Sequence, residues 1–198
     1  MNLDHLGDAL DHWKGSLIEM ICTEGVRVVP MLTDRDRWTE QHVETYARLL
    51  HLRPEDILKK GENDLFSSKT RDTYFRDVGQ HDLFLDPDTG IAPDDKDAEK
   101  KHIRTSEIAG LLSATPSRML LIYQHASRNK DGLRKKLNLL RSMEGLRGCD
   151  IFAYDSGAVA MVVISRNRER AQEALGRLKC RLGPIAAKRI VEPSASRG

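Results

Sequence analysis

The spacing of four apolar segments in the second half of the chain constrains its fold more than any other feature. The segments "HDLFLD" (residues 81–86) and "RMLLIYQH" (118–125) lie far apart, with a helical pattern between them. By contrast, "CDIFAY" (149–154) and "AVAMVVIS" (158–165) are separated only by "DSG". A parallel crossover needs about a dozen residues or more, so the short link predicts an antiparallel hairpin. The two earlier segments, each close to a continuous apolar run, are typical of buried parallel strands.

Several other segments have apolar residues at helical spacing, whereas residues 53–78 give only a poor signal. A further strand is expected over 24–32 and a short apolar stretch over 186–191, and helices are expected over 4–22, 33–50, 105–114, 130–143 and 167–182. The first helix is expected to be weakened at Gly15. Strands that alternate with helices predict an α/β fold, a three-layer sandwich whose mostly parallel sheet is closed by a C-terminal antiparallel hairpin. One domain is expected over residues 1–191, followed by a polar tail over 192–198.

Composition favours a soluble protein. Of the 198 residues 39% are hydrophobic and 31% charged, and the mean hydropathy is -0.50. The N-terminal stretch lacks the basic start and apolar run of a signal peptide, and no segment has the roughly 18 apolar residues of a membrane span. Cys22, Cys149 and Cys180 have no metal-ligand spacing and indicate buried thiols in a reducing compartment. A cytoplasmic protein without membrane contact is expected.

Charge is uneven along the chain, although the formal net charge is only +2. Residues 82–99 are acidic, whereas the segments over 125–148 and 165–190 are rich in Arg and Lys. A local basic surface is compatible with an anionic partner, and nucleic acid is the expected one. Solvated helix faces give the same residue count, so a protein partner or a homo-oligomer stays open.

Polar side chains gather where the expected strands end. In an open parallel sheet, ligands bind beyond the carboxyl ends of the strands. The residues at those ends are Pro30, Thr33 and Asp34 after the first strand, Asp86, Pro87 and Asp88 after the second, and His125 at the end of the third. Because proline cannot donate to a sheet ladder, Pro87 fixes where pairing stops and leaves Asp86 at the lip of the sheet. Turns are rich in Asp for local reasons too, so these residues are also compatible with a purely structural role.

The order of these motifs resembles the second half of a Rossmann-like S-adenosylmethionine-dependent methyltransferase. "LFLDPDTG" takes the place of that family's Asp-Pro-Pro-Tyr type motif, and "IFAYDSGAVAMVVI" that of its closing hairpin. The similarity is nearest to three-Cys-motif partner proteins and ribosomal RNA adenine methyltransferases, whose N-terminal helix also carries His and Lys, as "DHWKG" does at His12 and Lys14. It covers about two thirds of the chain, in topology more than in letters.

The resemblance implies roles for the candidate residues. Asp86 and the Pro87 carbonyl would accept the amino hydrogens of a base, with Asp88 and His125 beside them in the catalytic set. S-adenosylmethionine would lie against Pro30, Thr33 and Asp34. His12, Lys14 and Arg128 would contact a nucleic-acid substrate. The family holds its cofactor with a glycine-rich loop after the first strand, and "VRVVPMLTDRDRW" contains no glycine.

Three functions are therefore compatible with the sequence. The first is a methyltransferase-like enzyme that acts on nucleic acid. The second is a nuclease or phosphodiesterase in which Asp34, Asp86 and Asp88 hold Mg²⁺ or Mn²⁺, because hard cations prefer oxygen ligands. The third is a methyltransferase-like fold without catalysis that serves as a binding or partner protein, which the missing glycine loop favours.

Overall fold

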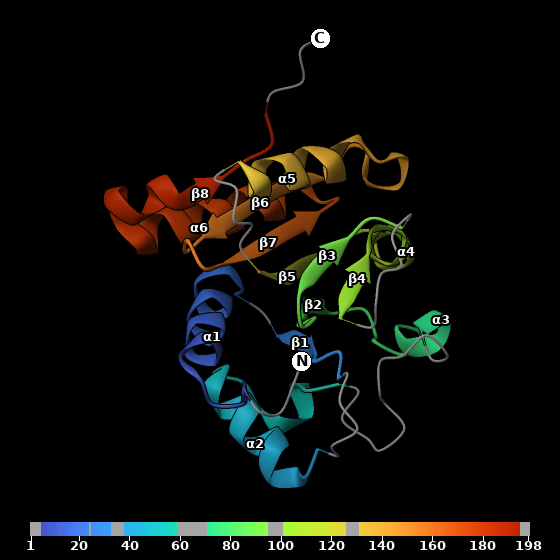
Figure 1. Ribbon diagram of the computed structural model, residues 1–198, viewed down its shortest axis with the longest axis vertical. Coiled ribbons are helices and arrows are strands. Elements are labelled where there is room, and N and C mark those ends of the chain that lie inside the picture. Colours follow the sequence, from blue (N-terminus) through green and yellow to red (C-terminus); the bar gives the residue numbers. More distant parts are fainter. Residues whose placement is uncertain are drawn as a thin grey trace.

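The computed structural model describes residues 5–23, 25–32, 38–58, 71–94, 101–125 and 131–194. Its centre is a six-stranded sheet in the order β1-β2-β5-β7-β6-β8 (Figure 1). The strands are β1 (Val26–Val29), β2 (Asp82–Leu85), β5 (Met119–His125), β6 (Asp150–Asp155), β7 (Val159–Ser165) and β8 (Ile190–Val191). The apolar segments of the sequence therefore form the middle of the sheet.

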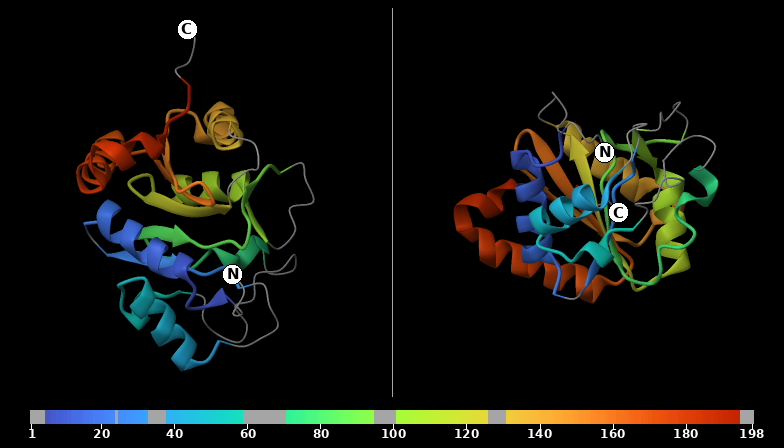
Figure 2. Two further views of the ribbon diagram at one scale, coloured as in Figure 1. Left: turned by 60° about the vertical axis from the view of Figure 1, so that its left-hand side comes forward. Right: turned by 90° about the horizontal axis from the view of Figure 1, so that it is seen from below.

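Helices cover both faces of this sheet, so the fold has three layers. They are α1 (Ala9–Ile21), α2 (Glu40–Leu49), α3 (Arg71–Tyr74), α4 (Thr105–Ala114), α5 (Gly132–Ser142) and α6 (Arg168–Ala186), with 3-10 turns η2 (Pro54–Asp56), η3 (Glu144–Leu146) and η4 (Ala187–Arg189). One hydrophobic cluster joins α1, α2 and α6 to the sheet, and the other joins α4 and α5 to its opposite face. The right-hand view of Figure 2 shows α1 and α6 on one side of the sheet and α4 on the other.

The sheet is mixed, and the expectation of a mostly parallel sheet is wrong. β2 pairs in parallel with β1 and β5, whereas β7 is antiparallel to β5 and β6, and β8 is antiparallel to β6. The expected hairpin is present, but its second strand lies beside β5, and its first strand carries β8 on its outer side. The hairpin therefore does not close the sheet.

Gly15 does not weaken the first helix, which runs unbroken from Ala9 to Ile21. Its role is to let α2 approach: a Cβ on Gly15 would collide with the backbone of Leu49 and Leu50. A residue that lowers helix propensity by about 1 kcal/mol is kept where two helix backbones meet closely. This contact brings α2 next to the part of α1 that carries Lys14.

Two three-residue strands come after β2 in the chain. β3 (Gly90–Ala92) and β4 (His102–Arg104) form a separate parallel pair. Gly90 has φ +120, and a Cβ there would overlap the Gln124 side chain, which accepts a hydrogen bond from the Ile91 amide at 2.9 Å. Glycine is thus required by both the backbone and the packing, and the loop after β2 is tied to the end of β5.

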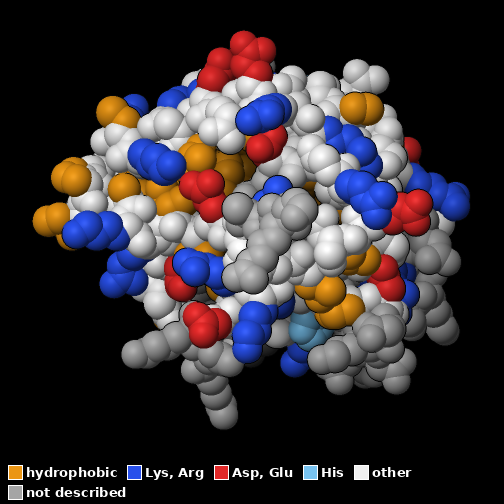
Figure 3. Space-filling view, turned by 90° about the horizontal axis from the view of Figure 1, so that it is seen from above, with side chains coloured by type: hydrophobic (Ala, Val, Ile, Leu, Met, Phe, Trp, Pro, Cys, Tyr) orange, Lys and Arg blue, Asp and Glu red, His pale blue; other side chains and the backbone are white. Residues whose placement is uncertain are grey.

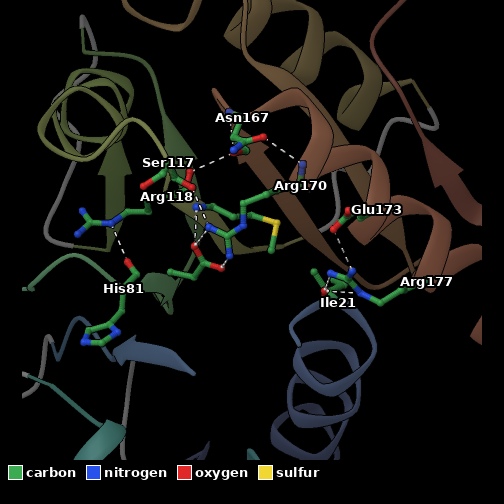
Figure 4. Close-up of polar contacts among 11 residues, drawn as sticks. Ile21, His81, Ser117, Arg118, Asn167, Arg170, Glu173 and Arg177 are labelled. Atoms are coloured by element: carbon green, nitrogen blue, oxygen red, sulfur yellow. Dashed lines mark hydrogen bonds and ion pairs between the residues drawn. The ribbon is translucent and has the colours of Figure 1, made fainter. Parts of the chain in front are cut away.

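The amino edge of the sheet is held by arginines (Figure 4). Asp82, at the start of β2, accepts hydrogen bonds from Arg170 on both carboxylate oxygens, at 3.2 and 2.7 Å, and from the Met119 amide at 2.8 Å. Arg118 is buried and donates to the carbonyl oxygens of Gly79, His81 and Leu111. Among the helices the structure describes, none is long and apolar enough to cross a membrane.

Candidate functional site

A pocket of about 350 Å³ opens at the carboxyl edge of the parallel strands. Asp86 and Pro87 reach it from the end of β2, Tyr123 and His125 from the end of β5, and Lys14 from α1. This is the position where an open α/β sheet binds its ligands. The volume suits a small molecule or part of a larger one. We call it the Asp86 pocket.

Asp86 is the buried centre of a polar network in this pocket. Its carboxylate is 2% exposed, and its Oδ2 accepts hydrogen bonds from Lys14 Nζ at 2.9 Å and from the Tyr46 hydroxyl at 2.6 Å. Its amide donates to the Val29 carbonyl at 3.0 Å, which extends the β1–β2 ladder. Within the described residues Asp86 Oδ1 accepts no hydrogen bond. One oxygen therefore holds the fold together, and the other has no hydrogen-bond partner in this described part of the chain.

Lys14 neutralises the negative charge of two carboxylates, Asp86 and Asp11. Its ammonium donates to Asp86 at 2.9 Å and to Asp11 at 3.0 Å, and it lies 4.7 Å from the centroid of the Tyr123 ring. Burial by itself lowers the pKa of Lys14, but the charges of Asp86 and Asp11 reverse this, so the net shift is upward. Lys14 is therefore a fixed cation that neutralises this region, not a free amine available for reaction.

The same network moves the pKa values of its other members. Burial raises the pKa of Asp11, which Lys14 opposes. Burial also raises the pKa of the Tyr46 phenol well above its ordinary value, and the charge of Asp86 adds to the effect. The raised pKa favours the protonated phenol, which donates its hydrogen to Asp86.

Tyr123 and His125 form the β5 side of the pocket. The Tyr123 hydroxyl lies 3.4 Å from His125 Nε2, and the two rings meet edge to face at a centroid distance of 5.2 Å. Burial raises the pKa of Tyr123 to about 12, with Lys14 acting against the shift and Asp86 adding to it. His125 is exposed at the rim. The pair gives the pocket a polar, aromatic wall.

The loop after Asp86 is held in place by backbone contacts to two other elements. The Thr89 amide donates to the Lys101 carbonyl at 2.9 Å, and the Thr89 carbonyl accepts from the His125 amide at 3.1 Å. Gln124 Nε2 donates to the same Thr89 carbonyl at 3.2 Å, and Lys136 donates to Gln124 Oε1 at 2.7 Å. The loop after Asp86 is thus held both by Lys101 and by the end of β5. A binding site needs rigid support of this kind.

The pocket as a whole is acidic. Its charged lining consists of four carboxylates, Asp8, Asp11, Asp86 and Asp88, and two ammonium groups, Lys14 and Lys101, with His5 and His125 at the rim. Asp8 is also committed locally, because it caps α1 through the Leu10 and Asp11 amides at 2.7 and 3.3 Å. The balance favours a ligand that donates hydrogen bonds, and it disfavours a phosphate in the pocket itself.

The structure brings together five of the residues that the sequence predicts for a site: Lys14, Asp86, Pro87, Asp88 and His125 all line the Asp86 pocket. His12, two residues before Lys14, is exposed and does not line it. Pro30 is buried and does not line it either. The predicted contributions of Thr33, Asp34 and Arg128 lie outside the described residues.

The described residues after β1 do not fit a cradle for S-adenosylmethionine. Such a cradle needs bare backbone, yet Met31 and Leu32 bury their side chains in the two hydrophobic clusters on opposite faces of the sheet. Met31 has φ +48, a conformation that glycine adopts more easily, and here it serves to place an apolar side chain in the core. We therefore derive no methyl-transfer step.

The predicted metal site does not assemble in the described part of the chain, where no three His, Cys, Asp or Glu side chains lie close enough to hold a metal ion. Asp34, one of the three expected ligands, lies outside that part. Asp86 Oδ2 is already occupied by a cation, Lys14 Nζ, at 2.9 Å. A divalent ion on the same carboxylate would be repelled by this ammonium group.

Sequence reasoning missed Asp11 and Tyr46. Asp11 precedes Lys14 by three residues on one helix face, a spacing that allows an ion pair. Tyr46 continues the buried stripe of α2 with Val43 and Ala47, and a buried tyrosine usually finds a hydrogen-bond partner for its hydroxyl. The sequence contains both signals, but neither one names Asp86 as the partner.

Comparison of the chain with protein-family models, with curated proteins and with solved structures gave no match in any of the three.

Proposed function

We propose that this chain is a methyltransferase-like α/β protein that binds the exocyclic amine of a nucleobase in the Asp86 pocket. The observation that carries the proposal is that the two oxygens of the Asp86 carboxylate differ in their hydrogen bonding. Oδ2 is fixed by Lys14 and Tyr46, while Oδ1, which accepts no hydrogen bond among the described residues, belongs to a side chain that lines the pocket. A fixed acceptor beside the Pro87 carbonyl suits an amino group that donates two hydrogens.

The fold supports this proposal at a coarser level. A mixed six-stranded sheet with helices on both faces is compatible with a Rossmann-like arrangement. Its three neighbouring parallel strands end at the same edge of the sheet, two of them, β2 and β5, contribute residues to the pocket, and the Asp-Pro pair lies at the end of the middle strand. The antiparallel hairpin follows later in the chain, as in the family that the sequence resembles.

Charge distinguishes a neutral amine from a cationic one. Lys14 already places a positive charge 2.9 Å from Asp86 Oδ2, so a second cation at the same carboxylate would be repelled. An uncharged amino group of adenine, cytosine or guanine avoids that cost and still satisfies the open oxygen. The Tyr123 and His125 rings supply aromatic surface close by.

Whether the bound base is modified depends on a methyl donor. Because the described residues after β1, 30–32, do not fit S-adenosylmethionine, binding without methyl transfer is the form of the proposal that the site supports best. An amine-binding pocket of this kind fits a binding or partner protein that shares the fold of the enzymes. The metal-dependent alternative is disfavoured by Lys14.

Calorimetric titration of nucleosides tests the proposal. Adenosine should bind, and inosine, which carries an oxygen in place of the amino group, should bind at least about tenfold more weakly, because a buried acceptor would face another acceptor. Asp86→Asn should abolish the preference for adenosine over inosine. Equal affinity for the two nucleosides, or a preference that survives Asp86→Asn, would contradict the proposal.

The same titration with S-adenosylmethionine separates the enzymatic version from the binding version. Heat of binding from S-adenosylmethionine that depends on Asp86-pocket residues would restore the methyltransferase interpretation. Tyr46→Phe is a matched control, since it removes a donor to Asp86 Oδ2 and leaves Oδ1 in place. Its preference for adenosine should persist at reduced stability.

A further inference from the structure

Three exposed arginines meet in a groove at the edge of the sheet opposite to the Asp86 pocket. The groove has a volume of about 710 Å³, and its charged lining consists of Arg141, Arg147, Arg168 and Asp150. Arg141 lies at the end of α5, Arg147 follows η3, and Arg168 begins α6. We call it the arginine groove.

The position of the groove follows from the sheet register. β6 and β5 are both antiparallel to β7, so β6 runs in the same direction as β5 and β2. Asp150 is the first residue of β6 and therefore lies at the amino edge, whereas Asp86 lies at the carboxyl edge. The arginine groove is thus separate from the pocket proposed for the amine.

These arginines differ from their neighbours in having no acidic partner within the described residues. Two residues after Arg168, Arg170 pairs with Asp82 at 2.7 Å, and Arg177 pairs with Glu173 at 3.7 Å. In contrast, neither Arg147 nor Arg168 makes a side-chain hydrogen bond or ion pair in the described part of the chain. Arg141 donates only to the Ser194 carbonyl, at 3.2 Å. Their guanidinium groups therefore remain available to an anion.

The charge distribution of the chain points the same way. Residues 131–198 contain 14 Lys and Arg against seven Asp and Glu, whereas residues 1–130 contain 18 against 23. Figure 3 looks down on the side that carries α5 and α6, and it shows Lys and Arg side chains spread over this face. The positive N-terminal end of α6, next to Arg168, adds to the potential of the groove.

We infer that the arginine groove binds the phosphodiester backbone of a nucleic acid. Guanidinium groups form two parallel hydrogen bonds to phosphate, which lysine cannot do. Asn138 and Ser142, which also line the groove, already donate to Ser194 Oγ at 3.3 Å and to the Leu139 carbonyl at 2.8 Å, so the arginines carry the contact to phosphate. A hollow lined by three arginines suits a nucleic-acid strand better than it suits the flat surface of a membrane.

This inference rests on other residues than the proposed function, and either can fail alone. If both hold, the amine pocket and the backbone groove lie at opposite edges of the sheet. A short oligonucleotide bound in the groove would then leave the Asp86 pocket free for another base. Loss of nucleoside preference in Asp86→Asn should not affect binding in the groove.

Fluorescence anisotropy with a labelled single-stranded oligonucleotide tests the inference. The triple variant Arg141→Gln, Arg147→Gln, Arg168→Gln should bind at least about tenfold more weakly than the unmodified chain. The slope of log affinity against log salt concentration should fall by about 2, since each lost phosphate contact on a single strand removes about 0.7. Thermal unfolding of both proteins shows that the comparison is between folded chains.

A matched control removes the same charge elsewhere. Arg48, Arg76 and Arg181 are exposed and do not line the groove, so changing all three to Gln should alter affinity and salt slope much less. An equal loss in both triple variants would overturn the inference, and so would the absence of binding by the unmodified chain. Dependence on the groove arginines of binding to anionic phospholipid vesicles, without any effect on the oligonucleotide, would overturn it too.

Discussion

The two ends of β2 carry the same residue type in two different settings. Asp82 at the amino end and Asp86 at the carboxyl end are both buried aspartates, and each pairs with a cation from a helix distant in sequence. Both oxygens of Asp82 accept hydrogen bonds from Arg170, so Asp82 itself offers no unpaired carboxylate oxygen to the hollow of about 300 Å³ beside it. Asp86 uses one oxygen for Lys14 and Tyr46.

The comparison teaches that burial and ion pairing do not by themselves identify a functional acid. A fully satisfied carboxylate stabilises the fold, whereas a carboxylate that is rigid but only half satisfied is prepared for a ligand. Under the proposed function, Asp82 has a structural role and Asp86 a binding role. The following substitutions test this difference between Asp82 and Asp86.

The largest effect is expected for Lys14→Met. The substitution leaves Asp11 and Asp86 buried without their shared cation, so the free energy of unfolding should fall by about 3–5 kcal/mol. Denaturant unfolding measures it. In the Asp86→Asn background the same change should cost clearly less, because one of the two carboxylates has already been neutralised. An equal loss of unfolding free energy in both backgrounds would show that Lys14 and Asp86 are not energetically coupled.

Asp82→Asn should cost less, about 2 kcal/mol, because the Arg170 side chain is already about one third exposed and can turn to water. Urea unfolding gives the loss, and nucleoside titration gives the effect on binding. We expect lower stability with unchanged preference for adenosine. A changed nucleoside preference would show that the amino end of β2 also contributes to binding. Asp82 and Asp86 would then not differ in role.

Gly90→Ala tests how firmly the loop after β2 is held in place. The left-handed backbone and the Gln124 contact at Gly90 predict a loss of about 1–3 kcal/mol and weaker nucleoside binding. Gly110→Ala is the matched control: Gly110 lies in α4 with open space at its Cβ position, so the substitution should stabilise by up to about 1 kcal/mol. Thermal unfolding compares the stability of the two variants. If Gly90→Ala does not change the stability, the loop after β2 is not rigid.

A loss of stability is also expected at high pH. Because burial raises the pKa of Tyr123 to about 12, the folded chain keeps a proton that the unfolded chain releases near pH 10. The stabilisation is complete below about pH 10 and is lost as the pH rises to about 12. The raised pKa of Lys14 acts in the same direction.

Phenolate absorbance and the free energy of unfolding, measured over this range, test the pH dependence. Tyr123→Phe should remove the Tyr123 part of the titration and make the decline in stability shallower. An unchanged decline in Tyr123→Phe would show that Tyr123 does not contribute to it.

The sequence predicted those parts of the fold and of the site that depend on local pattern. Apolar runs gave β2, β5, β6 and β7, and Pro87 after an apolar run located Asp86 at the end of a strand. Lys14 followed from the resemblance of its helix to known enzymes. These signals all lie within a few residues of the position that they describe.

Features that depend on distant contacts could not be predicted in this way. Tyr46 reaches Asp86 across 40 positions, and Gly15 is explained only by α2 packing against it. Nothing in the hairpin sequence says that its second strand inserts beside β5, and β3, β4 and β8 are too short to show a period. The balance of parallel and antiparallel pairs was therefore missed.

The central claim is that the carboxyl end of β2 binds a ligand and the amino end does not. Amide chemical-shift mapping by NMR during titration with adenosine tests it most directly. The account predicts shifts at Asp86, Asp88, Thr89 and the neighbouring residues of β5 and α1, and none at Asp82 or Met119. Shifts confined to the amino edge, or an absence of shifts at both ends, would contradict it.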